Sequence, residues 1–183
     1  MGGVMAGRLI YVMGPSGAGK DSVIGFARVN GDPAKTAFAH RYITRPPLAD
    51  AENHIALSEA EFENRRQAGW FALNWQSHGL RYGIGREIDL WLESGSTVVV
   101  NGSRAYLAEA TALYPDLQPV LITAPAGIRM ARLESRQRES GGDIQARIER
   151  QIDLDRLSHP IIEIDNSDTL ATAGNALLRL LEA

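Results

Sequence analysis

The sequence contains no cysteine, which excludes disulfide bonds, thiol catalysis and cysteine-ligated zinc. It has no apolar run near the length of about 20 residues that a membrane span needs. Residues 1–7 lack the basic stretch and apolar core of a secretory signal. The net charge of −3 gives no reason to expect a nucleic-acid surface. We therefore expect a cytoplasmic protein that binds neither membranes nor nucleic acid.

Lysine is also scarce. Only Lys20 and Lys35 occur among the 19 basic residues, and the others are arginines. This bias makes any single arginine weak support for phosphate binding. Lys20 stands where the composition favours arginine, so its identity carries more weight. The apolar share of 44% and the length of 183 residues are sufficient for one globular domain with a sizeable core.

Short apolar segments alternate with amphipathic segments along the chain. This order predicts an α/β fold with a doubly wound, mostly parallel sheet. Strands are expected at residues 8–13, 37–44, 70–75, 82–85, 97–101, 120–123 and 161–164. Helices are expected at residues 21–30, 58–68, 86–93, 104–113, 126–138, 143–157 and 169–181.

A glycine-rich loop follows the first predicted strand and precedes the first predicted helix. Its sequence, Gly14-Pro-Ser-Gly-Ala-Gly-Lys20, fits the pattern G-x-x-x-x-G-K. The glycines let backbone N–H groups turn toward phosphate oxygens, and the helix N-terminus adds partial positive charge. Lys20 is expected to reach the β- and γ-phosphates of ATP. The candidate ATP-binding residues of this loop are Gly14, Pro15, Ser16, Gly17, Ala18, Gly19, Lys20, Asp21 and Ser22.

The residue after the loop lysine departs from the usual pattern. Ser or Thr normally stands there as a magnesium ligand, whereas this chain has Asp21 followed by Ser22. One interpretation is that Asp21 only occupies the first turn of a helix, where a carboxylate is favoured. The other is that Asp21 holds Mg²⁺, directly or through water. A carboxylate beside a triphosphate is unfavourable without a cation, which favours the second interpretation.

Five segments in the same order resemble the guanylate kinase superfamily over nearly the whole chain. They are Gly14–Ser22, Thr44-Arg45-Pro46, Phe71–Gly83, Arg132–Arg136 with Arg147, and Asn166. The resemblance implies a P-loop kinase with a small acceptor-binding insertion and a helical lid. It also implies that Asn166 contacts adenine and that Arg132, Arg136 and Arg147 are catalytic lid residues. We therefore expect one kinase domain over residues 1–183, with a core at 1–36, 96–125 and 158–183, an acceptor-binding region at 37–95 and a lid at 126–157.

The departures from that superfamily are informative. Leu73 stands at the position of the guanine-reading glutamate, and Arg41 replaces a serine. Asn101 and Ser103 stand where the family has strand-end aspartates. A guanine edge needs hydrogen-bond acceptors, which Leu73 cannot supply, so the acceptor is expected to lack guanine. The pattern also predicts that negative charge near the metal has moved from position 101 to Asp21.

The deviating segments resemble the ribose 1,5-bisphosphate phosphokinases of phosphonate catabolism. They are Gly19–Ser22, Glu52-Asn53-His54, Phe71–Trp75, His78–Gly83 and Asn101–Arg104. The resemblance implies transfer of the γ-phosphoryl group of ATP to the 1-phosphate of ribose 1,5-bisphosphate, which gives 5-phospho-α-D-ribose 1-diphosphate (PRPP). The residues by themselves support only a small phosphorylated acceptor. The candidate acceptor-binding residues are Arg41, Arg45, Asn53, His54, Tyr82 and Arg104.

Three other functions remain open at this point. The first is a nucleoside monophosphate kinase, guanylate kinase included. The second is a non-catalytic, guanylate-kinase-like binding module, although the intact loop at Gly14–Lys20 argues against it. The third is a kinase that phosphorylates a free hydroxyl, for which no candidate base is apparent.

Overall fold

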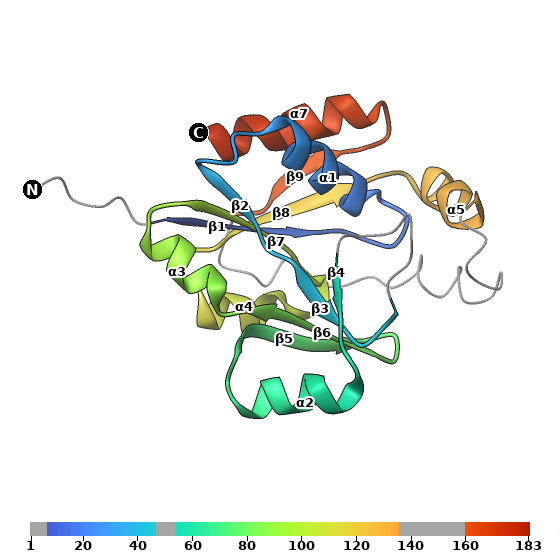
Figure 1. Ribbon diagram of the computed structural model, residues 1–183. Helices are drawn as coiled ribbons and strands as arrows, with labels where there is room; N and C mark the ends of the chain where they lie inside the picture. Colours follow the sequence, from blue (N-terminus) through green and yellow to red (C-terminus); the bar gives the residue numbers. More distant parts are fainter. Residues whose placement is uncertain (1–6, 47–53, 136–159) are drawn as a thin grey trace, which may run out of the picture.

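The computed structural model describes residues 7–46, 54–135 and 160–183, and it has two sheets (Figure 1). The first sheet has five strands in the order β2-β7-β1-β8-β9, and every pairing in it is parallel. Its strands are β1 (Arg8–Met13), β2 (Thr36–Phe38), β7 (Thr97–Asn101), β8 (Gln118–Thr123) and β9 (Ile162–Asp165). This arrangement confirms the α/β fold with a parallel sheet that the sequence predicts.

Helices cover both faces of the five-stranded sheet (Figure 1). They are α1 (Lys20–Asn30) and α7 (Leu170–Glu182) on one face, and α3 (Glu87–Glu93) and α4 (Leu107–Leu113) on the other. Strand β1 alternates between the two faces. Ile10 and Val12 join the cluster under α1 and α7, whereas Leu9, Tyr11 and Met13 join the cluster under α3 and α4. A parallel strand buried on both faces accounts for the nearly continuous apolar sequence of β1.

The second sheet has four strands in the order β4-β3-β6-β5. They are β3 (Arg41–Ile43), β4 (His54–Ala56), β5 (Phe71–Ser77) and β6 (Leu80–Gly85). Strand β3 pairs in parallel with β4 and antiparallel with β6, so that Arg41 lies opposite Ile84. This sheet is inserted in the chain between β2 and α3. The first and last of its strands along the chain, β3 and β6, are hydrogen-bonded neighbours.

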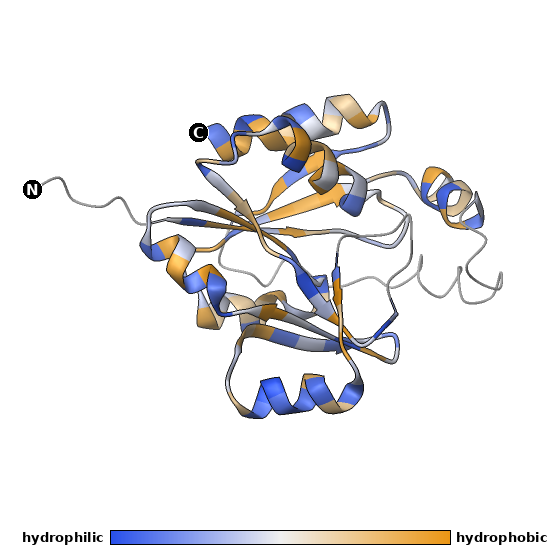
Figure 2. Cartoon of the chain, in the orientation of Figure 1, coloured by the Kyte–Doolittle hydropathy of each residue, from blue (hydrophilic) through white to orange (hydrophobic). Residues whose placement is uncertain are grey.

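Helix α2 (Glu59–Gln67) lies below the second sheet in Figure 1. The predicted capping box is present, since the Glu61 N–H donates to Ser58 Oγ at 3.1 Å. The helix is hydrophilic over most of its surface (Figure 2), and its one buried residue is Phe62. The Phe62 ring packs against Phe71 of β5, with the ring centroids 4.7 Å apart.

The predicted strand at residues 37–44 is wrong in one respect, because it is two strands in two sheets. The Ala39 N–H donates to the Val99 carbonyl and continues the pairing of β2 with β7. Two residues later, Arg41 pairs with Ile84 in the second sheet. The sequence did not indicate β4, and the predicted helix at 104–113 begins as the 3-10 helix η1 (Arg104–Tyr106).

Helix α5 (Ala126–Ser135) follows β8 and forms the first part of the predicted lid. The predicted helix at 143–157 lies outside the described residues. Among the described residues, no helix combines the length and apolar character needed to cross a bilayer.

Candidate active site

The phosphate loop connects β1 to α1, in the position that its sequence predicts. Gly19 precedes α1 and has a φ of 83°, a left-handed conformation that favours glycine. A side chain at this position would also collide with Nδ2 of Asn166. Gly19, the N-cap residue of α1, has no side chain that could cap the helix. The N-terminal turn of a helix attracts anions such as phosphate.

Lys20, Asp21 and Asn101 form a hydrogen-bonded cluster beside this loop. Lys20 Nζ lies 3.0 Å from Asp21 Oδ1 and donates to Asn101 Oδ1 at 2.5 Å. Asn101 Nδ2 donates to Asp21 Oδ1 at 2.7 Å. The structure thus brings together the loop lysine, the unusual Asp21 and the strand-end position at which the sequence had lost a carboxylate.

A second cation approaches the same carboxylate from the second sheet. Arg41 Nη2 lies 3.7 Å from Asp21 Oδ1, and the Arg41 side chain is only 11% exposed. Burial raises the pKa of the Asp21 carboxyl, but the charges of Lys20 and Arg41 and two hydrogen bonds outweigh that effect. Its pKa therefore lies below the ordinary value, and Asp21 is an anion at neutral pH.

A magnesium ion would fit this arrangement. Within the described ranges, no group of three or more His, Asp or Glu side chains forms a metal site. Among the described residues, Lys20, Arg41 and Asn101 contact Asp21 at Oδ1, so the second carboxylate oxygen could face a cation. Mg²⁺ is commonly held by one or two carboxylates together with substrate phosphates and waters. Asp21 is therefore the residue that would hold the ion.

The segment that follows Asn101 is held in place by a buried tyrosine. Tyr11 Oη donates to the Ser103 carbonyl and accepts from the Ser103 N–H, both at 2.9 Å. The Tyr11 ring fills the space that a side chain at Gly102 would need. Burial raises the pKa of the Tyr11 hydroxyl, which stays neutral and can donate. Sequence reasoning missed this role, because a tyrosine in an apolar strand resembles any other core residue.

An aromatic stack lies beside Arg41. The Arg41 guanidinium lies over the Tyr82 ring, 5.3 Å from its centroid. Tyr82 stacks on Trp75 at 5.5 Å, and Trp75 stacks on Tyr106 at 5.6 Å. The candidate residue Tyr82 thus joins the candidate residue Arg41, whereas Trp75 and Tyr106 were not among the predicted site residues. Trp75 and Tyr82 face each other across the β5–β6 hairpin, whereas Tyr106 belongs to η1, and no local pattern indicates that it joins them.

Other candidate acceptor residues lie on the same sheet or next to it. His54 Nε2 is 3.3 Å from the Arg45 carbonyl oxygen, and these residues flank the gap in the described chain. Arg104 begins η1, directly after the segment that Tyr11 supports. Asn53 lies outside the described residues. Leu73 is fully buried in the core with Tyr11 and Ile84, where it supplies apolar contact only.

Asn166 and Arg132 contact the phosphate loop through its backbone. Asn166 Nδ2 donates to the Ala18 carbonyl at 2.7 Å. Arg132 of α5 donates from Nη2 to the Asn166 carbonyl at 2.9 Å and from Nη1 to the Ala18 carbonyl at 3.4 Å. The loop, the β9–α7 connection and the start of the lid therefore meet at one carbonyl. The lid candidates Arg136 and Arg147 lie outside the described residues.

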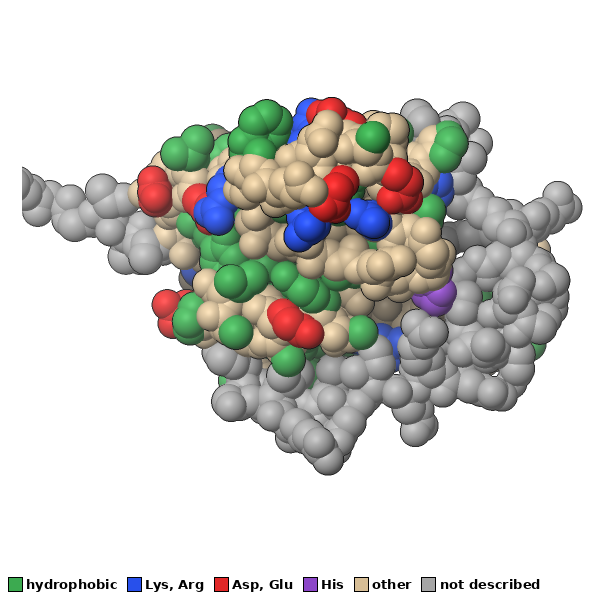
Figure 3. All heavy atoms as spheres, turned by 90° about the horizontal axis from the view of Figure 1, so that it is seen from below, with side chains coloured by type: hydrophobic (Ala, Val, Ile, Leu, Met, Phe, Trp, Pro, Cys, Tyr) green, Lys and Arg blue, Asp and Glu red, His purple; other side chains and the backbone are tan. Residues whose placement is uncertain are grey.

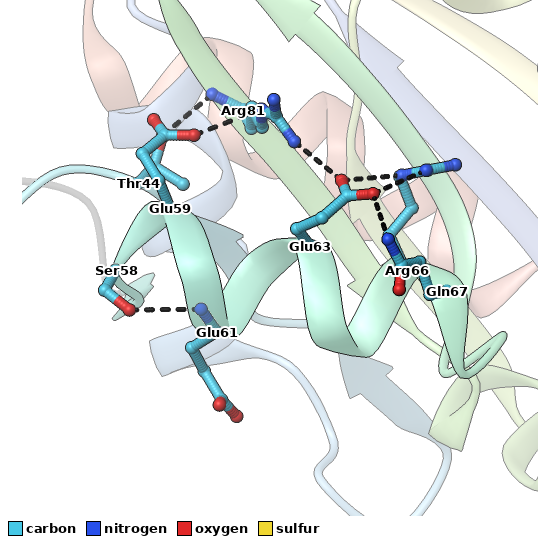
Figure 4. Close-up of polar contacts among 8 residues, drawn as sticks. All are labelled: Thr44, Ser58, Glu59, Glu61, Glu63, Arg66, Gln67 and Arg81. Carbon is cyan, nitrogen blue, oxygen red and sulfur yellow. Dashed lines mark hydrogen bonds and ion pairs between the residues drawn. The ribbon is translucent and has the colours of Figure 1, made fainter.

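A separate polar network covers α2 and β6 (Figure 4). Arg81 lies 3.1 Å from Glu59 and 2.8 Å from Glu63, and Glu63 also accepts from Arg66 at 2.6 Å. The Arg81 N–H donates to Thr44 Oγ1, one residue before Arg45. Acidic and basic side chains lie side by side on the face shown in Figure 3. This network joins α2 to the second sheet and lies away from the phosphate loop.

The chain is similar to several curated proteins over almost its whole length. It is 53% identical over 175 residues to a ribose 1,5-bisphosphate phosphokinase PhnN of Desulfomicrobium baculatum, covering 95% of this chain and 94% of that protein. It is 50% identical over 181 residues to the protein of that name from Burkholderia mallei, covering 97% and 96%. No family model matches the chain.

Solved structures agree with the fold. The guanylate kinase of Anaplasma phagocytophilum matches with a TM-score of 0.68 at 14% identity, over 97% of this chain and 85% of that chain. A gluconokinase of Sinorhizobium meliloti matches with a TM-score of 0.50 at 22% identity, over 97% and 95%. These identities are too low to indicate more than a common fold. At about half identity over nearly its full length, however, the chain belongs to the ribose 1,5-bisphosphate phosphokinase family.

Proposed function

We propose that this protein transfers the γ-phosphoryl group of ATP to the 1-phosphate of ribose 1,5-bisphosphate, giving PRPP and ADP. The observation that carries the proposal is an intact phosphate loop in which Lys20 and Arg41 both approach Asp21. It occurs in a chain that is 53% identical to a ribose 1,5-bisphosphate phosphokinase. An acceptor phosphate oxygen attacks the γ-phosphorus while the bond from that phosphorus to the β–γ bridging oxygen breaks. ADP leaves with the bridging oxygen.

The nucleotide is proposed to lie along the phosphate loop. The residues Gly14–Ser22 supply N–H groups and the Lys20 ammonium to its phosphates, and Asn166 lies at the adenine end. Asp21 is proposed to hold Mg²⁺, which neutralises charge on the β- and γ-phosphates when bound. Lys20 must exchange its contacts with Asp21 and Asn101 for phosphate oxygens as ATP enters. This exchange is favourable because a triphosphate carries more charge than one carboxylate.

The acceptor is proposed to lie against the second sheet. Arg41, Arg45 and Arg104 are the candidate phosphate ligands, because a planar guanidinium can bind a phosphate through two parallel hydrogen bonds. Asn53, His54 and Tyr82 are the candidate ligands for ribose hydroxyls or the remaining phosphate oxygens. The acceptor is already an oxyanion, so these residues need only align it and offset its charge.

The lid is proposed to complete the site. Arg132, Arg136 and Arg147 would approach the transferring group when the lid closes and excludes water. Arg132 would then exchange its carbonyl partners at Ala18 and Asn166 for phosphate oxygens. The protein is proposed to be a single domain with a core at 1–36, 96–125 and 158–183, an acceptor-binding region at 37–95 and a lid at 126–157. It is proposed to act in the cytoplasm on a small phosphorylated sugar.

A coupled assay of ADP formation tests the proposal. The assay compares ribose 1,5-bisphosphate with GMP, AMP, CMP and UMP in the presence of ATP and Mg²⁺, and phosphorus NMR identifies the product. Turnover with the sugar bisphosphate and formation of PRPP is the expected result. Turnover with GMP instead would make the protein a guanylate kinase. Failure to bind ATP at all would make it a binding module.

The two lysines of the chain provide a matched pair of variants. Lys20→Ala should lower kcat by about 10²- to 10³-fold, because a preorganised cation is lost from the transferring phosphate. Lys35→Ala should leave kcat unchanged, since the Lys35 side chain is 80% exposed and its ammonium lies 3.8 Å from Asp32, away from the loop. Equal effects of the two substitutions would contradict the assignment of Lys20.

A further inference from the structure

Asn101 connects the two charged residues of the phosphate site. Its Oδ1 accepts from the Lys20 ammonium at 2.5 Å, and its Nδ2 donates to the Asp21 carboxylate at 2.7 Å. A carboxamide carries one acceptor and one donor group in a single plane, so it satisfies a cation and an anion together. The side chain is 6% exposed, and water cannot easily replace either contact.

The contact with Asp21 requires a neutral side chain at position 101. A carboxylate there would place two anions at hydrogen-bond distance, and like charges so close disfavour ionisation of one of them. The charge of the site would change as well. Lys20 and Arg41 lie beside the Asp21 carboxylate, and their positive charges attract an incoming polyphosphate. A second carboxylate would weaken that attraction.

A merely apolar residue at position 101 would not serve either. The Lys20 side chain is 14% exposed, and its ammonium would lose the short contact with the amide oxygen. A partly buried charge that loses a hydrogen bond incurs a desolvation cost. The position therefore needs a polar group that carries no charge.

We propose that Asn101 is a positioning residue whose neutral amide is required because position 21 is an aspartate. The amide holds Lys20 and Asp21 in fixed places before the nucleotide enters, and it adds no negative charge beside the Lys20 ammonium. The consequence for ATP binding rests on the proposed kinase function. The dependence of Asn101 on Asp21 does not, because it concerns the protein without ligand.

The dependence is tested by a double-mutant cycle on the protein without nucleotide. Urea unfolding at neutral pH compares Asn101→Asp, Asp21→Ser and the double variant. Asn101→Asp should lower the unfolding midpoint, and the double variant should recover most of the loss, because the carboxylate introduced at position 101 then contacts Lys20 without a second carboxylate facing it.

Asn64→Asp is the matched control, since Asn64 is exposed on α2 and the same chemical change is made away from the site. A double variant as unstable as Asn101→Asp, or an Asn101→Asp midpoint equal to that of Asn64→Asp, would overturn the proposal.

Nucleotide binding provides a readout that a purely structural role would not move. Calorimetric titration with ATP, with Mg²⁺ and with a chelator, should give about tenfold weaker binding to Asn101→Asp than to the unmodified protein in the absence of metal. The double variant should regain the lost affinity. Turnover should show the defect mainly as a higher KM for ATP. Unchanged ATP affinity in a folded Asn101→Asp protein contradicts the inference, even if ribose 1,5-bisphosphate is the acceptor. Conversely, failure of that acceptor leaves the unfolding cycle intact as a test.

Discussion

The two sheets of the molecule are stabilised in different ways. The five-stranded sheet is covered on both faces, and its apolar side chains form two clusters that include β1, β8 and the flanking helices. The four-stranded sheet is joined to α2 through the single buried ring of Phe62 and an exposed network of ion pairs. The phosphate loop thus follows a strand that is buried on both faces. The second sheet packs on the core through one face, with Leu73 and Ile84 fully buried, and meets α2 through more exposed side chains.

The largest expected difference is in the free energy of unfolding, and it concerns two isoleucines of unequal burial, one in each sheet. Ile122 of β8 is 0% exposed, whereas Ile55 of β4 is 39% exposed. Ile122→Ala should lower the free energy of unfolding by about 2–5 kcal/mol, because it leaves a cavity in a closely packed core. Ile55→Ala should change it by only about 0.5 kcal/mol. Urea denaturation measures both, and equal losses would contradict the contrast.

A second variant tests the support beneath the site. Tyr11→Phe removes the hydroxyl that holds Ser103, and the free energy of unfolding should fall by about 1–3 kcal/mol, because the Ser103 N–H loses its partner. Tyr114→Phe is the comparison, since the Tyr114 hydroxyl donates at 2.5 Å to Asp89, a half-buried carboxylate that water can reach. Tyr114→Phe should lower the free energy of unfolding by less than Tyr11→Phe does. Unfolding curves in which Tyr114→Phe is the less stable protein would contradict this account.

The smallest expected effect concerns the ion pairs of α2. Hydrogen bonds from Arg66 and Gln67 lower the pKa of Glu63 to about 2. A carboxylate with a lowered pKa stabilises the fold above its ordinary pKa, near 4.5, and this contribution disappears as the pH falls toward 2. Glu63→Gln should therefore lower the melting temperature slightly at pH 7, and its difference from the unmodified protein should disappear as the pH falls toward 2.

Glu93→Gln, at the exposed end of α3, is the control for this measurement. It should follow the pH profile of the unmodified protein. A Glu63→Gln profile that coincides with the Glu93→Gln profile would show that the network adds nothing to stability.

The parts of the fold set by local patterns could be predicted from the sequence. The glycine loop between a strand and a helix, the capping box at Ser58 and the apolar strand at 97–101 were all recognisable, because each depends on neighbouring residues. The division of residues 37–44 between two sheets was not. No glycine or proline marks it, and it follows from pairing partners at Val99 and Ile84, which lie far along the chain.

The site shows the same limit. The positions of Lys20, Asp21 and Asn101 at one edge of the sheet follow from parallel topology. The orientation of the Asn101 amide does not, because it depends on contacts across 80 positions of sequence. The contact of Tyr106 with Trp75 and the support from Tyr11 likewise arise only when separate elements pack.

The pairing of Arg41 with Ile84 determines how readily the inserted sheet can be exchanged. The chain leaves the five-stranded sheet after β2 and returns to it through α3, and the two ends of this excursion lie on adjacent strands. An insertion whose ends meet can be lengthened or replaced without separating the strands on either side. Replacing residues 40–86 by the corresponding segment of another kinase of this fold should therefore leave the pairing of β2 with β7 in place. In such a chimera, the five-stranded sheet and its phosphate loop would stay constant while the inserted sheet is exchanged.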